Sequence, residues 1–337
     1  MIIHQNYSLK KLNTFGIDVR ASFYVRIDSI ADLQKALEKD WELPLMILGG
    51  GSNMLLTHNL ERVVLHICIK GIEQLKLAED KVQLRVAAGE NWHELVLYCL
   101  EKGYGGLENL SLIPGNVGTA PIQNIGAYGV ELRDVFLGCQ VVSIKEGSSE
   151  YMDKAACQFG YRDSVFKREL KGKVIITSID IELTTRDHFI KTTYGDIASR
   201  LKEAGIEKPS ISDVSEAVIA IRQAKLPDPA QIGNSGSFFK NPELPRDQFD
   251  RLQQRFPDIP HYPAPSGRIK VPAGWLIDQC GLKGFRRGDA GVHQKQALVL
   301  VNYGEANGKE ILNLAKHVQE EVMIRFGIQL TPEVNIL

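Results

Sequence analysis

The sequence lacks the cysteine and histidine patterns that build disulfide frameworks or metal centres. Its five cysteines, Cys68, Cys99, Cys139, Cys157 and Cys280, are scattered singly and form no C-x-x-C pair. The eight histidines include no H-x-x-x-H pair. An odd, dispersed set of cysteines is typical of reduced thiols in a cytosolic protein. We therefore expect no disulfide, no metal site and thiols that only pack in the interior.

The sequence also lacks a large net charge, long apolar runs and a nucleotide-hydrolysis motif. A formal net charge of -1 gives no overall footprint for nucleic acid. The apolar runs are of strand length and interrupted by charges, so no transmembrane helix is expected. The N-terminal residues MIIHQNYSLKKLNTFG lack the apolar core of a signal peptide. No G-x-x-x-x-G-K-[ST] occurs, which argues against nucleotide hydrolysis. We expect a cytoplasmic protein without nucleic-acid or membrane partners, and a monomer because no heptad stands out.

The 337 residues are enough for two or three domains, and their pattern predicts an α+β fold. Prolines 227 and 229 break the chain after a helix, which marks a domain boundary. Expected strands are 21–27, 44–48, 54–56, 63–69, 82–88, 135–144, 173–183, 297–302 and 329–337. Expected helices are 30–40 capped by Ser29, 92–103 capped by Asn91, one after residue 196, one from Ser212 to Lys225, 246–255, 273–282 and 307–326.

The stretch from Gly103 to Gly129 stands apart from these elements. It contains seven glycines, almost no charge and no helical or strand period. Glycine adopts backbone conformations closed to other residues and lets a ligand approach the main chain. One interpretation is a wall against a large ligand, with backbone N–H groups directed inward. The other is a glycine-rich connector between two strands, and the pattern alone leaves the two nearly even.

A second glycine cluster, Gly49-Gly50-Gly51-Ser52-Asn53, joins two short apolar runs. A strand, a glycine turn and a strand can expose consecutive N–H groups as an anion-binding nest. A tight hairpin is an equally good interpretation of these five residues. The dinucleotide fingerprint of a Rossmann unit is excluded, because Met54 stands where the third glycine is needed and no long helix follows.

Four polar residues are candidates for chemistry. Arg162, in FGYRDS, is suited to binding a carboxylate through two hydrogen bonds, although a surface turn with Asp163 is the commoner use of such a motif. Ser237, in GNSGSFF, has no evident histidine base and suits proton donation better than nucleophilic attack, the commoner reading being a turn serine. Lys225 ends a helix and Glu333 follows a proline, so both also fit ordinary solvated charges.

Seven motifs, in order, resemble the MurB family of UDP-N-acetylenolpyruvoylglucosamine reductases. They are GGGSN, IPGNVGTAPIQNIGAYG, FGYRDS, KLPDP, GSFFKNP, AGWLIDQCGLKG and TPEV, and the match runs from Asn13 to Glu333. The segment TTYGD looks like the type I subgroup, in which a tyrosine loop covers the substrate. The resemblance implies a two-subdomain FAD-binding fold of the vanillyl-alcohol-oxidase type, in residues 1–66 and 67–226, followed by an α+β substrate-binding domain in 227–337.

The resemblance also implies an activity in peptidoglycan precursor synthesis. NADPH would reduce a non-covalent FAD, and hydride would then pass to C3 of the enolpyruvyl group of UDP-N-acetylglucosamine enolpyruvate. Protonation at C2 would give UDP-N-acetylmuramate. The protein would supply orientation and electrostatics around the cofactor.

The same resemblance assigns roles to individual residues. Arg162, Ser237 and Glu333 would be catalytic, with Ser237 as the proton donor at C2. Substrate would be bound by Tyr161, Tyr194, Lys225, Asn241 and Gln296. FAD would be bound by Gly49, Gly50, Gly51, Ser52, Asn53, Ile113, Pro114, Gly115, Val117, Gly118, Ile122, Gln123, Asn124, Gly126, Ala127, Tyr128 and Arg222.

Three other functions remain open from the sequence. A different flavoprotein of the same fold would account for the two glycine-rich segments but not for the ordered polar set. A serine hydrolase would use Ser237 with His293 and either Asp278 or Asp289, although the G-x-S-x-G elbow is missing. A nucleotide-sugar binding protein without catalysis would not require the glycine-rich wall.

Overall fold

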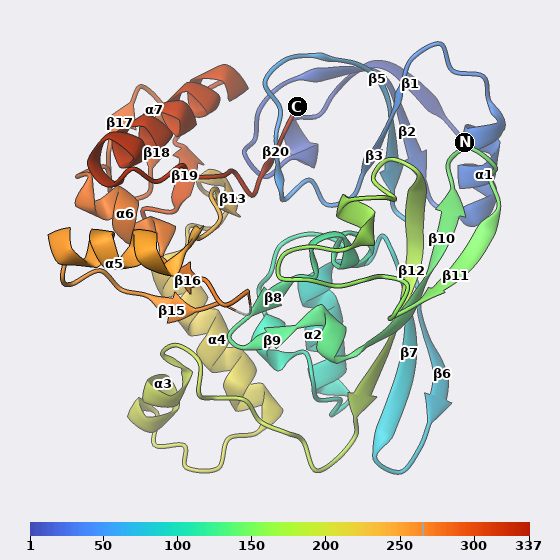
Figure 1. Ribbon diagram of the computed structural model, residues 1–337. Coiled ribbons are helices and arrows are strands. Elements are labelled where there is room, and N and C mark those ends of the chain that lie inside the picture. The colour runs from blue at the N-terminus through green and yellow to red at the C-terminus, as the bar shows by residue number, and fades with distance from the viewer. Residues whose placement is uncertain (265) are drawn as a thin grey trace. The chain divides into compact units, whose positions relative to one another are not determined.

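The chain passes back and forth between two structural units in this computed structural model, which describes residues 1–264 and 266–337 (Figure 1). The first unit combines Met1–Tyr7, Ala21–Gly50 and Glu61–Ala224. The second combines Ser8–Arg20, Gly51–Leu60 and Lys225–Leu337. The glycine cluster 49–53 is therefore divided, with Gly50 ending a segment of the first unit and Gly51 beginning one of the second.

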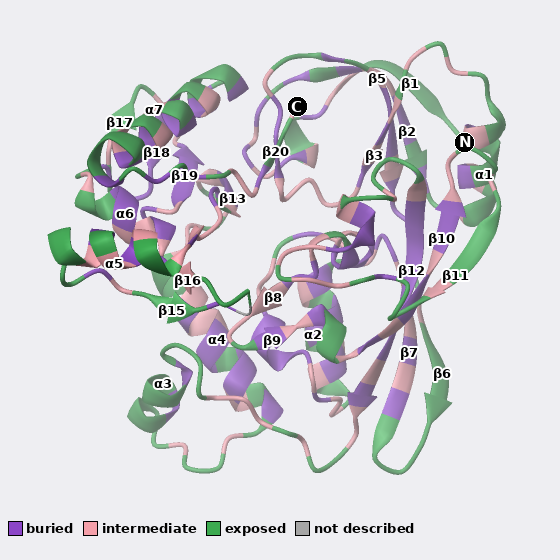
Figure 2. Cartoon of the chain, viewed as in Figure 1, coloured by how far each residue is buried: buried purple, intermediate pink, exposed green. Residues whose placement is uncertain are grey.

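An antiparallel sheet forms the larger core of the first unit. Its strand order is β11 (Ser149–Asp153), β10 (Phe136–Ser143), β12 (Val174–Thr184), β7 (Lys81–Ala87), β6 (Ile72–Leu77). Side chains alternate along each strand, so Val82, Leu84 and Val86 all face one side. That side packs against α2 (Trp92–Glu101) through a single buried cluster. Figure 2 shows the contrast between the buried strand β12 and the exposed edge strand β6.

A second sheet of the first unit has the order β1 (Ile3–Ser8), β2 (Arg20–Ile27), β5 (Leu60–Ile67), β3 (Leu45–Leu48). Strands β3 and β5 run parallel. Helix α1 (Ile30–Glu38) begins where the Ser29 side chain accepts a hydrogen bond from the Asp32 N–H. Its Leu33 and Ala36 join a buried cluster with strands β2 and β5.

The rest of the first unit is built around two helices. Helices α3 (Ile197–Glu203) and α4 (Ile211–Lys225) share a small apolar core. Helix α4 begins earlier than the expected Ser212, because the Ser210 hydroxyl accepts from the Asp213 N–H at 3.2 Å. The short strands β8 (Gly126–Ala127) and β9 (Val130–Glu131) pair with each other inside the glycine-rich region.

The second unit has its own sheet, in the order β13 (Gly233–Ser237), β19 (Val299–Asn302), β18 (Ala290–Val292), β17 (Arg286–Arg287). The long helix α7 (Gly308–Phe326) begins at the capping residue Asn307. The remaining elements are α5 (Arg246–Arg255), α6 (Ala273–Gln279), β14 (Glu243–Leu244), β15 (Tyr262–Pro263), β16 (Ile269–Lys270) and the parallel pair β4 (Met54–Leu55) and β20 (Asn335–Ile336).

The sequence-based expectations missed two strands and placed one wrongly, and one of the two open interpretations of residues 49–53 is excluded. Strands β6 and β11 were not foreseen, because they lie at the two edges of the sheet and their side chains are mostly exposed. The expected strand 329–337 pairs only at 335–336, apart from one bridge between Pro332 and Phe239. Residues 49–53 are not a hairpin turn, because β3 pairs with β5 whereas β4 pairs with β20.

Two further observations bear on the class of protein. All five cysteines are free thiols; four of them are buried, whereas Cys280, which was also expected to pack in the interior, is only partly buried. Within 1–264 and 266–337, no helix combines the length and apolar character needed to cross a membrane.

Candidate active site

The stretch 103–129 forms short 3₁₀ turns, at 108–110, 117–119 and 121–123, joined by irregular backbone. Three non-glycine residues in it have left-handed backbones: Leu112 (φ 59°), Asn124 (φ 43°) and Tyr128 (φ 49°). Such conformations cost free energy and persist where surrounding structure enforces them. Their occurrence in one segment shows that the surrounding structure dictates its main-chain path.

Glycines bring the turn at 49–50 against this stretch within the first unit. A Cβ added to Gly50 would lie 2.8 Å from the Cα of Gly115 and 2.9 Å from the Asn116 Oδ1. A Cβ on Gly118 would lie 2.5 Å from the Cβ of Ala88. Both distances are too short for real atoms, so close backbone approach requires glycine here. Main-chain groups from two glycine-rich segments are thereby gathered in one place.

The second part of the glycine cluster is held inside the second unit. Gly51 has a left-handed φ of 62°, and its carbonyl accepts from the Thr14 N–H at 3.1 Å. The Asn53 carbonyl accepts from both the main chain and the side chain of Asn335, at 3.2 and 2.9 Å. The Thr14 hydroxyl is buried and has no partner among the described residues. Sequence reasoning gave Thr14 no role.

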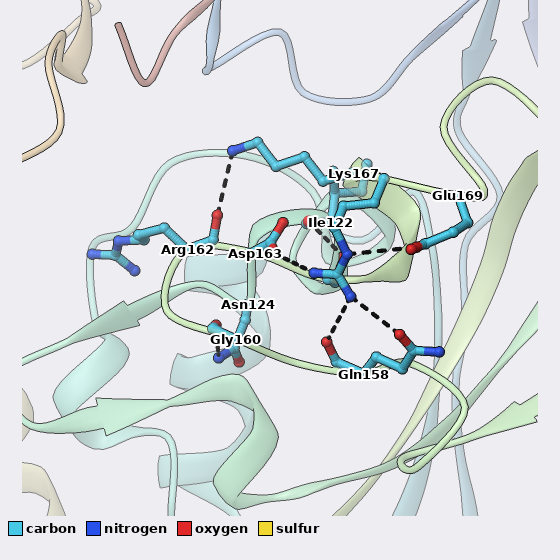
Figure 3. A network of polar contacts seen from close by, with 10 residues as sticks. Ile122, Asn124, Gln158, Gly160, Arg162, Asp163, Lys167 and Glu169 are labelled. Carbon is cyan, nitrogen blue, oxygen red and sulfur yellow. Dashed lines mark hydrogen bonds and ion pairs between the residues drawn. The ribbon is translucent and has the colours of Figure 1, made fainter. Parts of the chain in front are cut away.

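Three hydrogen bonds tie the FGYRDS motif to the glycine-rich stretch, and Figure 3 includes the one between Asn124 and Gly160. The buried Asn124 donates to the Gly160 carbonyl at 3.1 Å, and Ser164 donates to the Ile122 carbonyl at 2.7 Å. The guanidinium of Arg162 donates to the Gly126 carbonyl at 2.6 Å. Two segments far apart in sequence are thus joined, and the guanidinium of Arg162 lies beside the glycine-rich stretch.

The alternative interpretation of Arg162, a surface turn in which it pairs with Asp163, holds for the turn but not for the pairing. Gly160 and Asp163 do close a turn, each accepting from the other's N–H. Arg162 has a left-handed φ of 54°, and Figure 3 shows its guanidinium directed away from the Asp163 carboxylate. Asp163 forms an ion pair with Arg168. The turn therefore presents the arginine rather than neutralising it with its neighbour.

A second cation, Arg222, lies in the last turns of helix α4. Its Nε is buried and has no hydrogen-bond partner within the described part of the chain. Burial lowers the pKa of Arg222, Tyr128 raises it and the nearby Arg162 lowers it further. A buried cation that lacks a carboxylate partner favours an anionic or strongly accepting ligand.

Two tyrosines of the first unit remain exposed near the same segments. Tyr161 is 43% exposed, and its ring centroid lies 5.9 Å from the Arg162 Cζ. Tyr194 is 62% exposed and lies close to Gly129, where an added Cβ would be 3.3 Å from the Tyr194 Cβ. An aromatic ring with a hydroxyl that the protein leaves uncovered is suited to closing over a partly apolar ligand.

The second unit gathers the predicted polar residues on adjacent strands. Ser237 pairs with Val299, and the Phe238 carbonyl accepts from the Glu333 N–H at 2.8 Å. The chain that carries Ser237 thus runs between residues 298–299 on one side and 331–333 on the other. The buried rings of Phe238 and Phe239 fix the main chain directly after the exposed Ser237. Ser237 and Glu333 therefore lie on neighbouring backbone segments.

Asn241, Gln296 and Lys225 belong to the same unit. The Asn241 Oδ1 accepts from the Ala273 N–H at 2.9 Å, which sets its orientation at the start of helix α6. The Gln296 Oε1 accepts from the Leu298 N–H at 3.3 Å and would lie 3.0 Å from a Cβ at Gly274. Lys225 is exposed.

The serine hydrolase alternative does not fit this unit. A histidine base needs a carboxylate to orient its ring, but the His293 Nδ1 is buried without a partner among the described residues. Asp278 pairs with Lys283 at 3.1 Å, and Asp289 pairs with Arg286 at 2.7 Å. Burial lowers the pKa of His293, and Lys295 lowers it further. No described carboxylate completes the triad.

Comparisons with known proteins agree with this geometry. Residues 21–150 match the sequence model of an FAD binding domain. Residues 228–337 match that of the C-terminal domain of UDP-N-acetylenolpyruvoylglucosamine reductase. The chain is 51% identical to the reductase of that name from Flavobacterium johnsoniae, over the whole of both chains. It is 49% identical to that of Pseudomonas aeruginosa, over 99% of this chain and 98% of the relative.

Solved structures show the same relationship. The crystal structure of UDP-N-acetylenolpyruvylglucosamine reductase (MurB) from Thermus caldophilus superposes with a TM-score of 0.70 at 26% identity, covering 100% of this chain and 99% of the other. The structure of 6-hydroxy-D-nicotine oxidase from Arthrobacter nicotinovorans has a TM-score of 0.51 at 15% identity, covering 92% and 82%, and shows likeness of fold alone. The α+β flavoprotein fold and the FAD cofactor expected from the sequence are confirmed.

The residues of the first unit fit FAD on their own terms. The close approach of Gly50 to Gly115 brings main-chain groups of the two glycine-rich segments together, and the unpartnered Arg222 Nε can donate to a group that accepts a hydrogen bond.

Proposed function

This chain belongs to the UDP-N-acetylenolpyruvoylglucosamine reductase family, and from that premise we propose that it reduces UDP-N-acetylglucosamine enolpyruvate to UDP-N-acetylmuramate. NADPH is the reductant and FAD the bound cofactor. The observation that carries the proposal is the hydrogen bond from the Glu333 N–H to the Phe238 carbonyl, which places Glu333 on the backbone segment beside the one that carries Ser237, inside the region that matches the family's C-terminal domain. A hydroxyl and a carboxyl group carried by neighbouring backbone segments suit addition across an enol ether.

The reaction adds hydride to C3 and a proton to C2 of the enolpyruvyl group. FAD, when bound, supplies the hydride chemistry, drawing on NADPH. Arg162 binds the substrate carboxylate and stabilises the negative charge that develops toward it. Glu333, when protonated, donates a hydrogen bond to the same oxygens. Ser237 gives its hydroxyl proton to C2, assisted by the positive charge of Lys225.

The remaining site residues bind and orient. Tyr194, Lys225, Asn241 and Gln296 hold the nucleotide sugar, and Tyr161 borders the nicotinamide and substrate positions. Tyr194 closes over the uridine part. The FAD-binding residues lie in the clusters 49–53, 113–118 and 122–128, together with Arg222. The close approach of Gly50 to Gly115 and the buried Arg222 Nε support this assignment.

We also propose the division into FAD-binding subdomains at 1–66 and 67–226 and a substrate-binding domain at 227–337. The start of the long C-terminal stretch of the second unit at Lys225 supports the last boundary, although that unit also takes in Ser8–Arg20 and Gly51–Leu60. The enzyme is proposed to act as a cytoplasmic monomer.

The proposal is tested first by colour. Purified protein should be yellow, should bleach with NADPH under anaerobic conditions, and should regain colour when UDP-N-acetylglucosamine enolpyruvate is added. A colourless protein that takes up no FAD would remove the reductase function. A flavin that NADPH reduces but the nucleotide sugar does not reoxidise would point to another flavoenzyme.

Variants then separate the two half-reactions. Ser237→Ala should leave flavin reduction by NADPH unchanged and slow the oxidation of reduced flavin by the nucleotide sugar about 10²- to 10⁴-fold, the usual contribution of general acid catalysis. Arg162→Ala and Glu333→Gln should likewise cripple only the second half-reaction. Ser266→Ala, which alters an exposed serine of the same unit, is the matched control. Equal loss of both half-reactions in Ser237→Ala would refute its role as proton donor.

A further inference from the structure

Asn109 is a buried amide that joins two distant parts of the first unit. Its side chain is 1% exposed and lies in the turn 108–110 of the glycine-rich stretch. Its Nδ2 donates to the Tyr128 carbonyl at 3.0 Å and to the Lys191 carbonyl at 2.9 Å. Main-chain carbonyls only accept, so the amide must present its NH₂ group to both. The Oδ1 accepts no hydrogen bond from the described residues.

One of the two carbonyls, that of Lys191, lies directly before the tyrosine loop, residues 192–196. The other, that of Tyr128, lies in the segment that this loop contacts. Lys191 lies at the start of the segment that leads to Tyr194. Tyr128 immediately precedes Gly129, and a Cβ on Gly129 would lie 3.3 Å from the Tyr194 Cβ. In the reciprocal contact, a Cβ on Gly195 would lie 3.5 Å from the Tyr128 ring. One side chain therefore holds both partners of this contact.

The other side-chain contact at this end of the loop is weak by comparison. The Lys191 Nζ lies 3.4 Å from the Asp134 carboxylate, and both side chains are more than a third exposed. Exposed ion pairs contribute little, because water and salt screen them. The hydrogen bonds of Asn109 are shielded from water, which makes them the stronger restraint on where residue 191 lies.

We propose that Asn109 is a positioning residue for substrate binding, which holds the loop so that Tyr194 rests on Gly129 ready to cover the nucleotide part of the substrate. The inference rests on the proposed function, because it assigns the covered ligand as the UDP moiety. Asn109 itself touches no reacting atom. Its effect passes through the main chain of Lys191 and Tyr128 to the ring of Tyr194.

The test uses Asn109→Leu in the FAD-loaded full chain. Leucine nearly matches asparagine in shape and donates no hydrogen bond, so the interior stays filled. The dissociation constant of UDP-N-acetylglucosamine enolpyruvate, followed by the change in flavin absorbance, should rise about tenfold, as expected for losing two hydrogen bonds that order the loop. The rate of flavin reduction by NADPH should stay within about twofold, because the loop is not proposed to act in that step.

A double-mutant cycle separates positioning from general damage. If Asn109 acts through the tyrosine, Asn109→Leu should add nothing in a Tyr194→Ala background. Lys191→Met is the matched control, because it removes the exposed ion pair with Asp134 and keeps the Lys191 carbonyl. It should change the dissociation constant less than about twofold. Additive effects in the cycle, or an unchanged dissociation constant in Asn109→Leu, would overturn the proposal.

A ligand-free measurement keeps the inference separate from the proposed function. Amide hydrogen exchange in residues 191–196 should be faster in Asn109→Leu than in the wild type and unchanged in Lys191→Met. Wild-type protein that fails to bind the nucleotide sugar would count against the proposed function and leave this measurement valid. Should Asn109→Leu fail to retain FAD, Asn109→Ser keeps one donor and gives the same comparison at lower amplitude. Unchanged amide exchange in the Asn109 variants would refute the proposal that Asn109 restrains residues 191–196.

Discussion

Gly50→Ala should weaken FAD binding or destabilise the first unit, because the added methyl group has no room. Its Cβ would lie 2.8 Å from the Gly115 Cα and 3.1 Å from the Asn116 N. Carbon atoms in contact stay about 3.5–4.0 Å apart, so the turn and the segment must separate by about 1 Å. Gly50 does not have a positive φ, so the backbone itself tolerates alanine and the cost is purely one of packing.

Overpacking of this kind costs about 1–3 kcal/mol. Because 1.4 kcal/mol corresponds to a factor of ten, the change in an equilibrium constant is about 5- to 150-fold. If the turn relaxes in the apoprotein, the strain returns when FAD binds, and the whole cost appears as a higher dissociation constant for FAD. If the turn stays closed, the free energy of unfolding carries it instead.

The assay therefore measures both quantities. FAD binding to apoprotein is followed by quenching of flavin fluorescence, and apoprotein unfolding is followed in urea. The two losses together should reach about 1–3 kcal/mol. Gly160→Ala is the control, because its Cβ would lie 3.5 Å from the nearest atom, an ordinary contact. A Gly50→Ala protein that binds FAD and unfolds like the wild type would show that the close approach is not required.

Three further substitutions test which buried polar side chains stabilise each unit. Asn13→Ala should lower the free energy of unfolding by about 2–4 kcal/mol in urea titrations, since the buried amide makes three hydrogen bonds to the main chain of Leu9 and Ile17; an unchanged midpoint would contradict this. Asn124→Ala should cost a similar amount, about 2–4 kcal/mol, through lost hydrogen bonds and a left-handed alanine, and Asn124→Gly should recover the backbone part alone. Burial lowers the pKa of His93, so its contribution to stability is present above the unfolded pKa of about 6.5 and is lost as pH falls toward the folded pKa. Unfolding of His93→Gln measured between pH 7.5 and 5 should depend less on pH than that of the wild type, and an equal dependence would refute the assignment.

Local structure was the part of the fold that sequence patterns predicted well. Helix α1 begins after Ser29, helix α2 after Asn91 and helix α7 after Asn307, each with the side-chain cap that its residue type suggests. These signals need only neighbours within one helical turn, so they survive in any fold. Sequence patterns failed to predict strands whose formation depends on a neighbouring strand. Residues 72–77 and 149–153 are mostly exposed, and they form edge strands because β7 and β10 offer them hydrogen bonds.

The candidate site divides in the same way. Ordered motifs predicted the family, the cofactor and the residue set, because the chemistry of an enolpyruvyl reductase requires those residue types. The pattern did not reveal Asn109, whose importance comes from two carbonyls brought to it by folding.

By itself, then, the sequence determined the types of most elements, the starts of helices α1 and α2, and the glycine-rich segments that match a flavoprotein. Only the tertiary structure decided that Arg162 bonds to the wall at Gly126, that Ser237 and Glu333 become neighbours, and that residues 49–53 are no hairpin. The physical reason is that each of these depends on hydrogen bonds between segments remote in sequence. Such bonds are set by the packing of whole sheets and leave no periodic trace in the chain.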